Sequence, residues 1–199
     1  MRVYRIPFST NVERIALAAG HKGVEIEWID VEETDRSPVV AVSGQPLVPV
    51  LVVDDFVLAD SPRILDWLEE QYPEPALLPA DPARRAEVRI FCDWFNRVWK
   101  RFPNELEAHL LDGEPTAAES VAMRDAVVLF ESLLDAREYL FGEFGLADVT
   151  AFPFLKYASF GLTPGDDDLF HRILVEHMPL APESPLHEWA RRVDAHPRS

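Results

Sequence analysis

The chain has 199 residues and a formal net charge of −16, from 35 acidic and 19 basic side chains, which argues against a nucleic-acid or anionic-membrane partner. Its hydrophobic content of 48% is normal for a globular protein, and no stretch approaches the roughly 20 apolar residues of a membrane span. The single cysteine, Cys92, excludes an internal disulfide, and residues 1–8 lack the apolar run of a signal peptide, so we expect a cytoplasmic protein.

The first thirty residues predict a β-α-β unit. Apolar residues up to position 6 indicate a strand, and alternating apolar and acidic side chains at residues 24–30 indicate a second one. Between them, apolar spacing predicts a helix that starts at Thr10, with Glu13 completing a capping box. A right-handed crossover through this helix would make the two strands parallel. Residues 31–46 are polar and predict a loop with room for one helical turn.

A β-hairpin and a helix are predicted next. Apolar segments at residues 47–53 and 56–59 flank two aspartates at 54–55, and aspartate tolerates the geometry of a tight turn. Ser61 and Pro62 then have the composition of a helix start, with Ser61 as the N-cap and Pro62 in the first helical position. Apolar residues at helical spacing follow, so we expect a helix that ends near residue 72.

Pro49 interrupts the first strand of this hairpin, where it cannot donate a ladder hydrogen bond. Such a proline should lie at a sheet edge or at a strand start. A cis Val48-Pro49 bond would also resolve the conflict, because cis peptides occur almost only before proline. The N–H and C=O of Val48 would then be exposed beside the strand, and the helix that starts near Ser61 offers N–H groups to an anion. Together these features predict a docking edge for an extended, peptide-like ligand that carries a carboxylate.

Prolines at four positions mark a linker at residues 73–82, between a first domain at 1–75 and a helical domain at 83–199. The first helix of the second domain is expected to bury residues spaced by three and four: Val88, Phe91, Phe95, Val98 and Phe102. Pro103 should kink or end that helix, because proline has no N–H to donate.

Three further helices are predicted from apolar spacing. A long one should cover residues 117–139, with Val121, Val128 and residues 129–134 partly inward. A strongly apolar helix is expected at residues 145–160, and a last one should begin at Ser184.

The chain resembles the glutathione transferase superfamily. The matching residues are Val48-Pro49-Val50-Leu51, Asp60-Ser61, Trp67-Leu68 and Tyr72-Pro73. The usual pattern there is a Val-Pro-Val-Leu strand, an acidic residue followed by serine, and a helix ending in Tyr-Pro. Gly145 and Asp148 stand where the family has a Ser/Thr-x-x-Asp capping box, with glycine replacing the hydroxyl residue. The resemblance covers both halves of the chain and implies an α+β protein: a thioredoxin-like N-terminal domain followed by an all-α C-terminal domain.

The resemblance also implies a function. It suggests a cytoplasmic homodimer that conjugates or exchanges glutathione, or another low-molecular-weight thiol, with a small apolar electrophile. Val48, Pro49, Asp60 and Ser61 would bind the tripeptide, and Gln45 would contact its glycyl end. The histidines and the one cysteine show no metal-ligand spacing, so no metal is expected. No nucleotide-binding fingerprint occurs in the sequence.

Thiol activation needs a group that stabilises the thiolate, such as a hydroxyl or a helix N-terminus. Related redox proteins carry Cys-Pro-Phe-Cys at the first helix start, and several transferase classes carry Ser-Pro-Phe. The first Cys or Ser of these motifs would fall on Ile6, which can neither donate a hydrogen bond nor attack. Ser9 and Thr10 are the candidates, with Asn11 a further one. The structural alternatives are a turn residue for Ser9 and a simple N-cap for Thr10.

Aromatic side chains in the second domain could bind the electrophile. We expect Trp94 to line its pocket and Trp99 to lie in the core, although an aromatic stripe at helical spacing is also typical of a core. Ile6 favours an alternative function, a non-catalytic binding or stress-response protein with the transferase fold. A glutaredoxin-type reductase is disfavoured, because neither position 6 nor position 9 is a cysteine.

Overall fold

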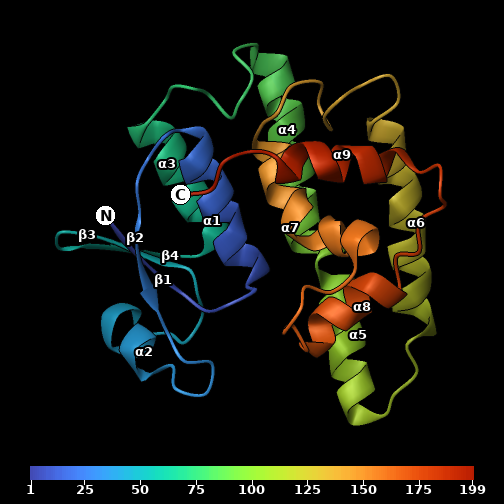
Figure 1. The fold of residues 1–199 in the computed structure, drawn as a ribbon, viewed down its shortest axis with the longest axis horizontal. Helices are drawn as coiled ribbons and strands as arrows, with labels where there is room; N and C mark the ends of the chain where they lie inside the picture. The colour runs from blue at the N-terminus through green and yellow to red at the C-terminus, as the bar shows by residue number, and fades with distance from the viewer. The chain divides into compact units, whose positions relative to one another are not determined.

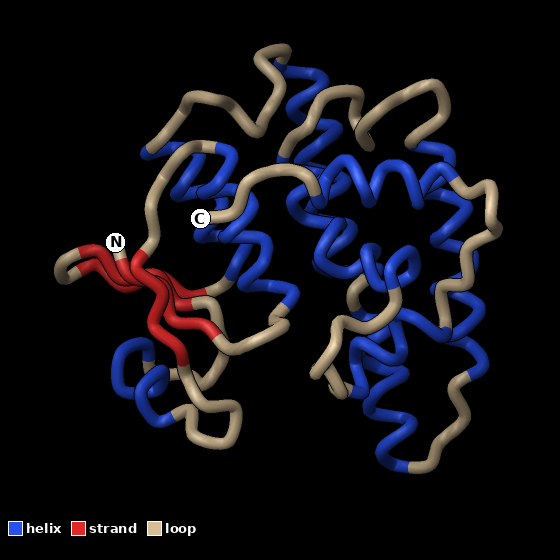
Figure 2. Tube along the Cα trace, in the orientation of Figure 1, coloured by secondary structure: helices blue, strands red, loops and turns tan.

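The computed structural model describes residues 1–199 and divides them into two compact units. Unit 1 comprises residues 1–77 together with 196–199, and unit 2 comprises residues 78–195. All strands belong to unit 1, and unit 2 is helical (Figure 2). None of the helices has both the length and the apolar character that crossing a membrane requires.

Unit 1 is a four-stranded sheet with helices on both faces (Figure 1). Its elements are β1 (Arg2–Arg5), α1 (Thr10–His21), β2 (Glu27–Asp30), α2 (Ser37–Ser43), β3 (Val50–Val53), β4 (Phe56–Ala59) and α3 (Ser61–Gln71). The strand order is β2-β1-β3-β4, in which β1 and β2 are parallel and the other pairs are antiparallel. This is the thioredoxin-like arrangement that the sequence predicted.

Different helices bury the two faces of this sheet. Val39 of α2 packs with Val50 and Val52 of β3 in one core cluster. Val3 and Leu51 are paired across β1 and β3, and because side chains alternate along a strand they bury the opposite face, on the side of α1 and α3. The helices α1 and α3 therefore lie on the same face of the sheet, which holds their N-termini in place.

Two elements of unit 1 differ from their predicted extents. β2 begins at Glu27, three residues later than expected, because only that part pairs with β1. Residues 37–43 form α2, a helix longer than the single turn predicted. Gly44 ends it with φ at +75°, a left-handed conformation that glycine adopts without steric cost.

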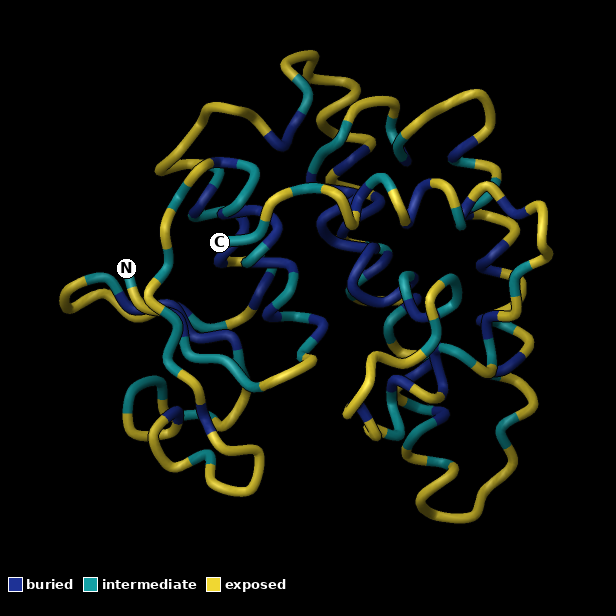
Figure 3. Tube along the Cα trace, viewed as in Figure 1, coloured by how far each residue is buried: buried dark blue, intermediate teal, exposed yellow.

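Unit 2 is built around one buried helix. Its elements are α4 (Pro82–Trp94), η1 (Phe95–Trp99), α5 (Arg101–Asp112), α6 (Ala117–Leu133), α7 (Leu146–Phe160), α8 (Leu169–Glu176) and α9 (Pro185–Asp194). The helix α7 packs against α4, α8 and α9, and most of its residues are buried (Figure 3). A helix that is apolar on every side is stable when neighbouring helices cover it all round, as they do here.

A π-helical turn changes which side chains of the first helical stretch are buried. In η1 the N–H of Lys100 donates to the carbonyl of Phe95, five residues back, at 2.9 Å. Such a turn accommodates one extra residue. The buried stripe therefore continues from Phe95 to Trp99, which is fully buried, whereas Val98 is 44% exposed and its expected burial was wrong. The first helical stretch ends at Trp99, and Pro103 lies in the first turn of the next helix, α5, where a missing N–H costs little; the break expected near Pro103 is therefore present.

The orientation of α6 also differs from the prediction. Val121 and Val128, expected partly inward, are 48% and 67% exposed. Met123 is fully buried instead. Phe130, which lies within the range 129–134 expected inward, is also fully buried and contacts rings of the aromatic core. The helix ends at Leu133, six residues before the expected end. The helix is thus rotated so that Met123, Val127 and Phe130 face inward, and Val121 and Val128 are left outside.

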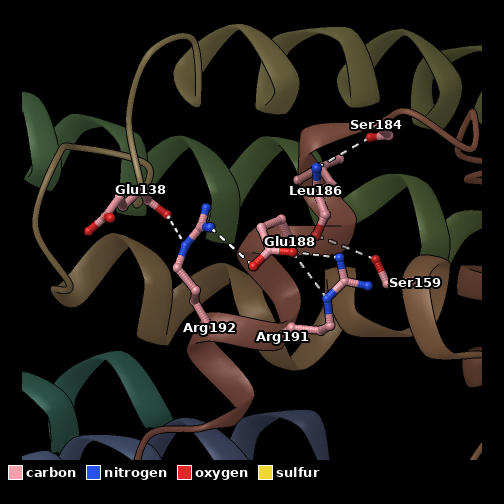
Figure 4. Close-up of polar contacts among 7 residues, drawn as sticks. All are labelled: Glu138, Ser159, Ser184, Leu186, Glu188, Arg191 and Arg192. Atoms are coloured by element: carbon pink, nitrogen blue, oxygen red, sulfur yellow. Dashed lines mark hydrogen bonds and ion pairs between the residues drawn. The ribbon is translucent and has the colours of Figure 1, made fainter.

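The last helix, α9, follows the prediction at its start. Ser184 is the N-cap, and its Oγ accepts a hydrogen bond from the N–H of Leu186 at 3.3 Å (Figure 4). On the outer face Glu188 pairs with Arg191 at 2.6 Å and with Arg192 at 3.5 Å. Exposed pairs of this kind contribute little to stability. The buried inner face, which carries Trp189, therefore holds the helix in place.

Candidate functional site

The first turns of α1 and α3 lie side by side in unit 1. The Nη1 of Arg14, in α1, lies 3.3 Å from the Oγ of Ser61, the first residue of α3. The same nitrogen donates to the Oδ1 of Asn11 at 3.3 Å, and the hydroxyl of Ser61 donates to that oxygen at 3.2 Å. The positive ends of two helix dipoles therefore meet in one region, next to a buried guanidinium.

Ser9 occupies the N-cap position of α1. Its Oγ accepts from the N–H of Val12 at 3.4 Å, and the side chain is half-buried. A hydroxyl that accepts in this way keeps its own hydrogen, which it can donate to a sulfur. Thr10, expected as the N-cap, is instead the first helical residue and is 6% exposed. The expected capping box with Glu13 was wrong, because the helix is capped one residue earlier.

Ile6 does not lie at the helix start. It packs against the core cluster beneath the sheet. Phe8 follows with φ at +59°, a conformation that is strained for a bulky residue, and it is 41% exposed. Such strain often marks functional segments. The chain thus turns sharply after Ile6, and Ser9 is the first hydroxyl at the N-terminus of α1.

The Val48-Pro49 peptide is cis, as the sequence predicted. Val48 precedes the paired residues of β3, which begin at Val50, so its backbone lies outside the ladder. The amide of Gln45 is used within its own loop: Nε2 donates to Ser43 Oγ at 3.0 Å and to Leu47 O at 2.9 Å, and Oε1 accepts from Leu47 N at 2.6 Å. A ligand contact by Gln45 would have to replace these bonds.

No side-chain hydrogen bond caps the N-terminus of α3. Asp60, not Ser61, holds the N-cap position, with φ at +81°, and its side chain makes no capping hydrogen bond. Ser61 is 2% exposed and belongs to the network with Asn11 and Arg14. The expected N-cap role of Ser61 is thus shifted by one residue, which places its backbone N–H in the first turn of the helix.

Arg14 is a site residue that the sequence did not reveal. Its side chain is fully buried, although arginine is almost never buried without partners. The only local signal was its position three residues after Asn11, on the same helix face as buried Leu17 and Ala18. Its contact with Ser61 spans 47 residues of sequence and depends on the packing of α1 against α3.

The aromatic candidates lie in unit 2. Trp99 is fully buried and stacks on Phe95 at 4.4 Å between ring centroids, which confirms its prediction as a core residue. Trp94 is half-buried against Phe91 at 5.9 Å and Phe130 at 6.0 Å, and its role in electrophile binding stays a prediction. No group of three or more His, Cys, Asp or Glu side chains is placed to hold a metal ion.

Comparisons with known proteins agree with this architecture. The family model described as "Glutathione S-transferase, N-terminal domain" matches residues 3–76. Maleylpyruvate isomerase of Ralstonia sp is 43% identical over 93 residues, covering 45% of this chain and 44% of that protein. FtsZ-localized protein A of Caulobacter vibrioides is 30% identical over 186 residues, covering 83% of this chain and 80% of that protein. A holo structure of a zeta-class maleylpyruvate isomerase aligns with a TM-score of 0.74 at 27% identity, covering 97% and 96% of the two chains.

The chain belongs to the glutathione S-transferase superfamily. The fold, the cis proline before β3 and the acidic-Ser pair at the start of α3 are all in the places that the resemblance required. The sequence alignment with the Ralstonia isomerase spans less than half of that protein, so it identifies the family and not the substrate.

Proposed function

We propose that unit 1 binds glutathione, or a closely related γ-glutamyl thiol, across the starts of α1 and α3. The observation that carries this proposal is the Arg14–Ser61 contact, which brings the two helix N-termini together. The γ-glutamyl carboxylate would bind at the first turn of α3, with the carboxylate of Asp60 near its ammonium. The backbone of Val48 would hydrogen-bond the cysteinyl residue, and Gln45 would reach the glycyl end after leaving its loop contacts.

In this proposal the thiol is activated at the start of α1. The hydroxyl of Ser9 donates a hydrogen bond to the sulfur, and the dipole of α1 favours the thiolate over the thiol. Thr10, which is buried, supports this turn. The thiolate then attacks an electrophilic carbon. With a halide, the carbon–sulfur bond forms as the carbon–halogen bond breaks and halide ion leaves; with an unsaturated acid or enone, it forms as the carbon–carbon π bond opens and the neighbouring carbon takes a proton from water. The contribution of the protein is to hold the tripeptide in place and to keep the sulfur ionised near neutral pH.

Two observations suggest the chemical class of the electrophile. The aromatic side chain of Trp94 suits a small apolar compound. The relative named maleylpyruvate isomerase supports an unsaturated acid, to which a thiolate can add. A panel that contains maleylpyruvate and apolar halides or enones therefore covers both classes.

Calorimetric titration with glutathione tests the binding step. We expect saturable binding to the wild-type protein and weaker binding to Ser61→Ala, because the substitution removes a hydroxyl from the start of α3. Ser132→Ala is the matched control, since Ser132 is an exposed serine of α6. Wild-type protein that does not bind glutathione, or equal affinity of all three proteins, would contradict the proposed site.

Substitution of Ser9 tests the chemical step. We expect Ser9→Ala to lower turnover with glutathione about 100-fold, the usual effect of removing one hydrogen-bond donor from a developing or resident anion. Affinity for glutathione should change much less, because the sulfur is a small part of the tripeptide. Unchanged turnover in steady-state kinetics would exclude Ser9 as the activating group.

A second candidate function is a non-catalytic binding protein with this fold. It is favoured by one observation: a relative that aligns over 83% of this chain and 80% of its own length is named FtsZ-localized protein A. Co-sedimentation with FtsZ filaments tests it directly. A protein that sediments with the filaments, binds no glutathione and turns over none of the panel would be assigned to this second function.

We also propose that the protein is a homodimer, as the family resemblance implies. Exposed aromatic side chains gather on unit 1. Phe56, which is 47% exposed, stacks on Trp67 at 6.3 Å between ring centroids, and Tyr72 contacts Trp67 edge-on at 6.3 Å. A row of aromatic rings at the surface supports contact with a second copy, because aromatic residues are enriched in protein interfaces.

A further inference from the structure

The last four residues of the chain are built into unit 1. The N–H of Ser199 donates to the carbonyl of Ala16 in α1 at 3.1 Å. Its Oγ accepts from the N–H of Ile26 at 2.9 Å, and its carbonyl accepts from the Nε1 of Trp28 at 3.0 Å. In Figure 1 the C-terminal end lies against α1. After α9 the chain therefore returns to the helix whose first turn carries Ser9.

Arg198 forms an ion pair with the first turn of this helix. Its Nη2 lies 3.2 Å from the Oε1 of Glu13, a contact between residues 185 positions apart in the sequence. The two side chains are only 25% and 19% exposed, so solvent screens the pair less than it would at an open surface. The Nη1 of Arg198 also donates to the carbonyl of His196 at 2.7 Å, which fixes the direction of the guanidinium.

Glu13 lies one helical turn from Ser9. Its N–H donates to the carbonyl of Ser9 at 3.0 Å. A glutamate in the first turn interacts favourably with the positive end of the helix dipole, and a thiolate at the N-terminus would draw on that same positive end. Without the guanidinium of Arg198, the negative charge of Glu13 would oppose a thiolate at this helix start, in a chain that already carries a formal charge of −16.

We propose that Arg198 is a positioning residue for thiol activation, which acts by neutralising Glu13 and so keeps the N-terminus of α1 available to an anion. The C-terminal segment, residues 196–199, places the positive charge of Arg198 beside Glu13. The proposal rests on the proposed thiol chemistry at Ser9, and it adds a residue that neither the family pattern nor the local sequence of α1 contains.

A double-substitution cycle tests the electrostatic role. The pKa of the thiol of bound glutathione is measured from thiolate absorbance against pH in wild type, Arg198→Met, Glu13→Gln and Glu13→Gln/Arg198→Met. We expect Arg198→Met to raise that pKa by about half a unit, the size of a charge effect at a helix end. The double variant should return to the wild-type value or below. Arg101→Met, which breaks an exposed pair with Glu105 in α5, is the matched control and should cause no shift.

The double variant separates charge from structure. If Arg198→Met acts only by loosening the C-terminal segment, the additional Glu13→Gln substitution cannot restore the thiol pKa, and that result would overturn the proposal. An unshifted pKa in Arg198→Met would also overturn it.

A second measurement does not depend on glutathione. In a Ser9→Cys background the new thiol lies at the N-cap itself, and its pKa is read from the pH dependence of alkylation. Arg198→Met should raise this pKa by a similar amount, and Glu13→Gln should reverse the rise. If wild-type protein binds no glutathione but these shifts occur, the proposed function fails and the role of Arg198 stands. If the shifts are absent, the role of Arg198 fails whatever glutathione does.

Discussion

Asp148 joins three segments of unit 2 through one buried carboxylate. Its Oδ1 accepts from the Nε1 of Trp189 at 2.8 Å and from the N–H of Leu140 at 3.1 Å, and its Oδ2 accepts from the N–H of Gly145 at 3.1 Å. Burial raises the pKa of Asp148 from 3.8 to about 6, even though these hydrogen bonds lower it. Desolvation of the charge therefore outweighs three donors.

The raised pKa of Asp148 predicts a pH dependence of stability. Between about pH 4 and pH 6 the native state holds a proton that the unfolded chain has released, so the contribution of Asp148 to the free energy of unfolding increases as the pH falls through 6. The shift corresponds to about 3 kcal/mol across that window. Chemical denaturation of wild type and Asp148→Asn should therefore show a larger stability difference at pH 5 than at pH 7. A difference that is constant with pH would contradict the raised pKa.

At the scale of elements, the packing of the C-terminal segment against α1 requires a residue without a side chain at position 20. A Cβ at position 20 would lie 2.2 Å from the carbonyl oxygen of Pro197, far inside any real contact, and that oxygen belongs to rigid backbone. Alanine normally stabilises a helix interior by about 0.5–1 kcal/mol relative to glycine. In α1 the clash that a Cβ would make with Pro197 outweighs this gain in helix stability.

Gly20→Ala is therefore expected to destabilise the protein despite its better helix propensity. We predict a decrease of about 1–3 kcal/mol in the free energy of unfolding, the usual cost of overpacking, measured by chemical denaturation. In a chain that lacks residues 196–199 the same substitution should instead stabilise by about 0.5–1 kcal/mol, because the clash is absent. The same sign in both backgrounds would show that the contact with Pro197 does not limit this position.

What the sequence could predict of these elements depends on how local their causes are. The cis Val48-Pro49 bond and the Ser184 cap follow from residues next to each other, and both were predicted. The π-turn before Lys100 was missed, since α-helical spacing fits Val98 as well as Trp99 and only packing in the aromatic core selects Trp99.

For the candidate site, too, residues with local signals could be proposed from the sequence and residues with distant partners could not. Ser9 and the Asp60-Ser61 pair were proposed from the family resemblance together with helix-start composition, which placed each N-cap one residue too late. Arg14 and Arg198 could not, because their partners are 47 and 185 residues away and become neighbours only in the folded unit.

At the scale of the whole molecule, the charge of −16 opposes self-association at long range. The aromatic row of Phe56, Trp67 and Tyr72 would have to provide the short-range attraction for the proposed homodimer. Added salt screens the repulsion between two acidic copies and leaves the burial of aromatic surface intact. The two contributions can therefore be separated by ionic strength.

Trp67→Glu tests the proposed dimer surface. We expect the wild-type protein to sediment as a dimer whose dissociation constant falls as salt is raised from low to physiological concentration, and we expect Trp67→Glu to sediment as a monomer. The substitution removes a ring that contacts two others and places a further negative charge in the contact. Leu111→Glu is the matched control, since Leu111 is 72% exposed in α5 and adds the same charge away from the aromatic row. A dimer that tolerates Trp67→Glu would show that copies associate through another surface, and a wild-type monomer at all salt concentrations would exclude the homodimer.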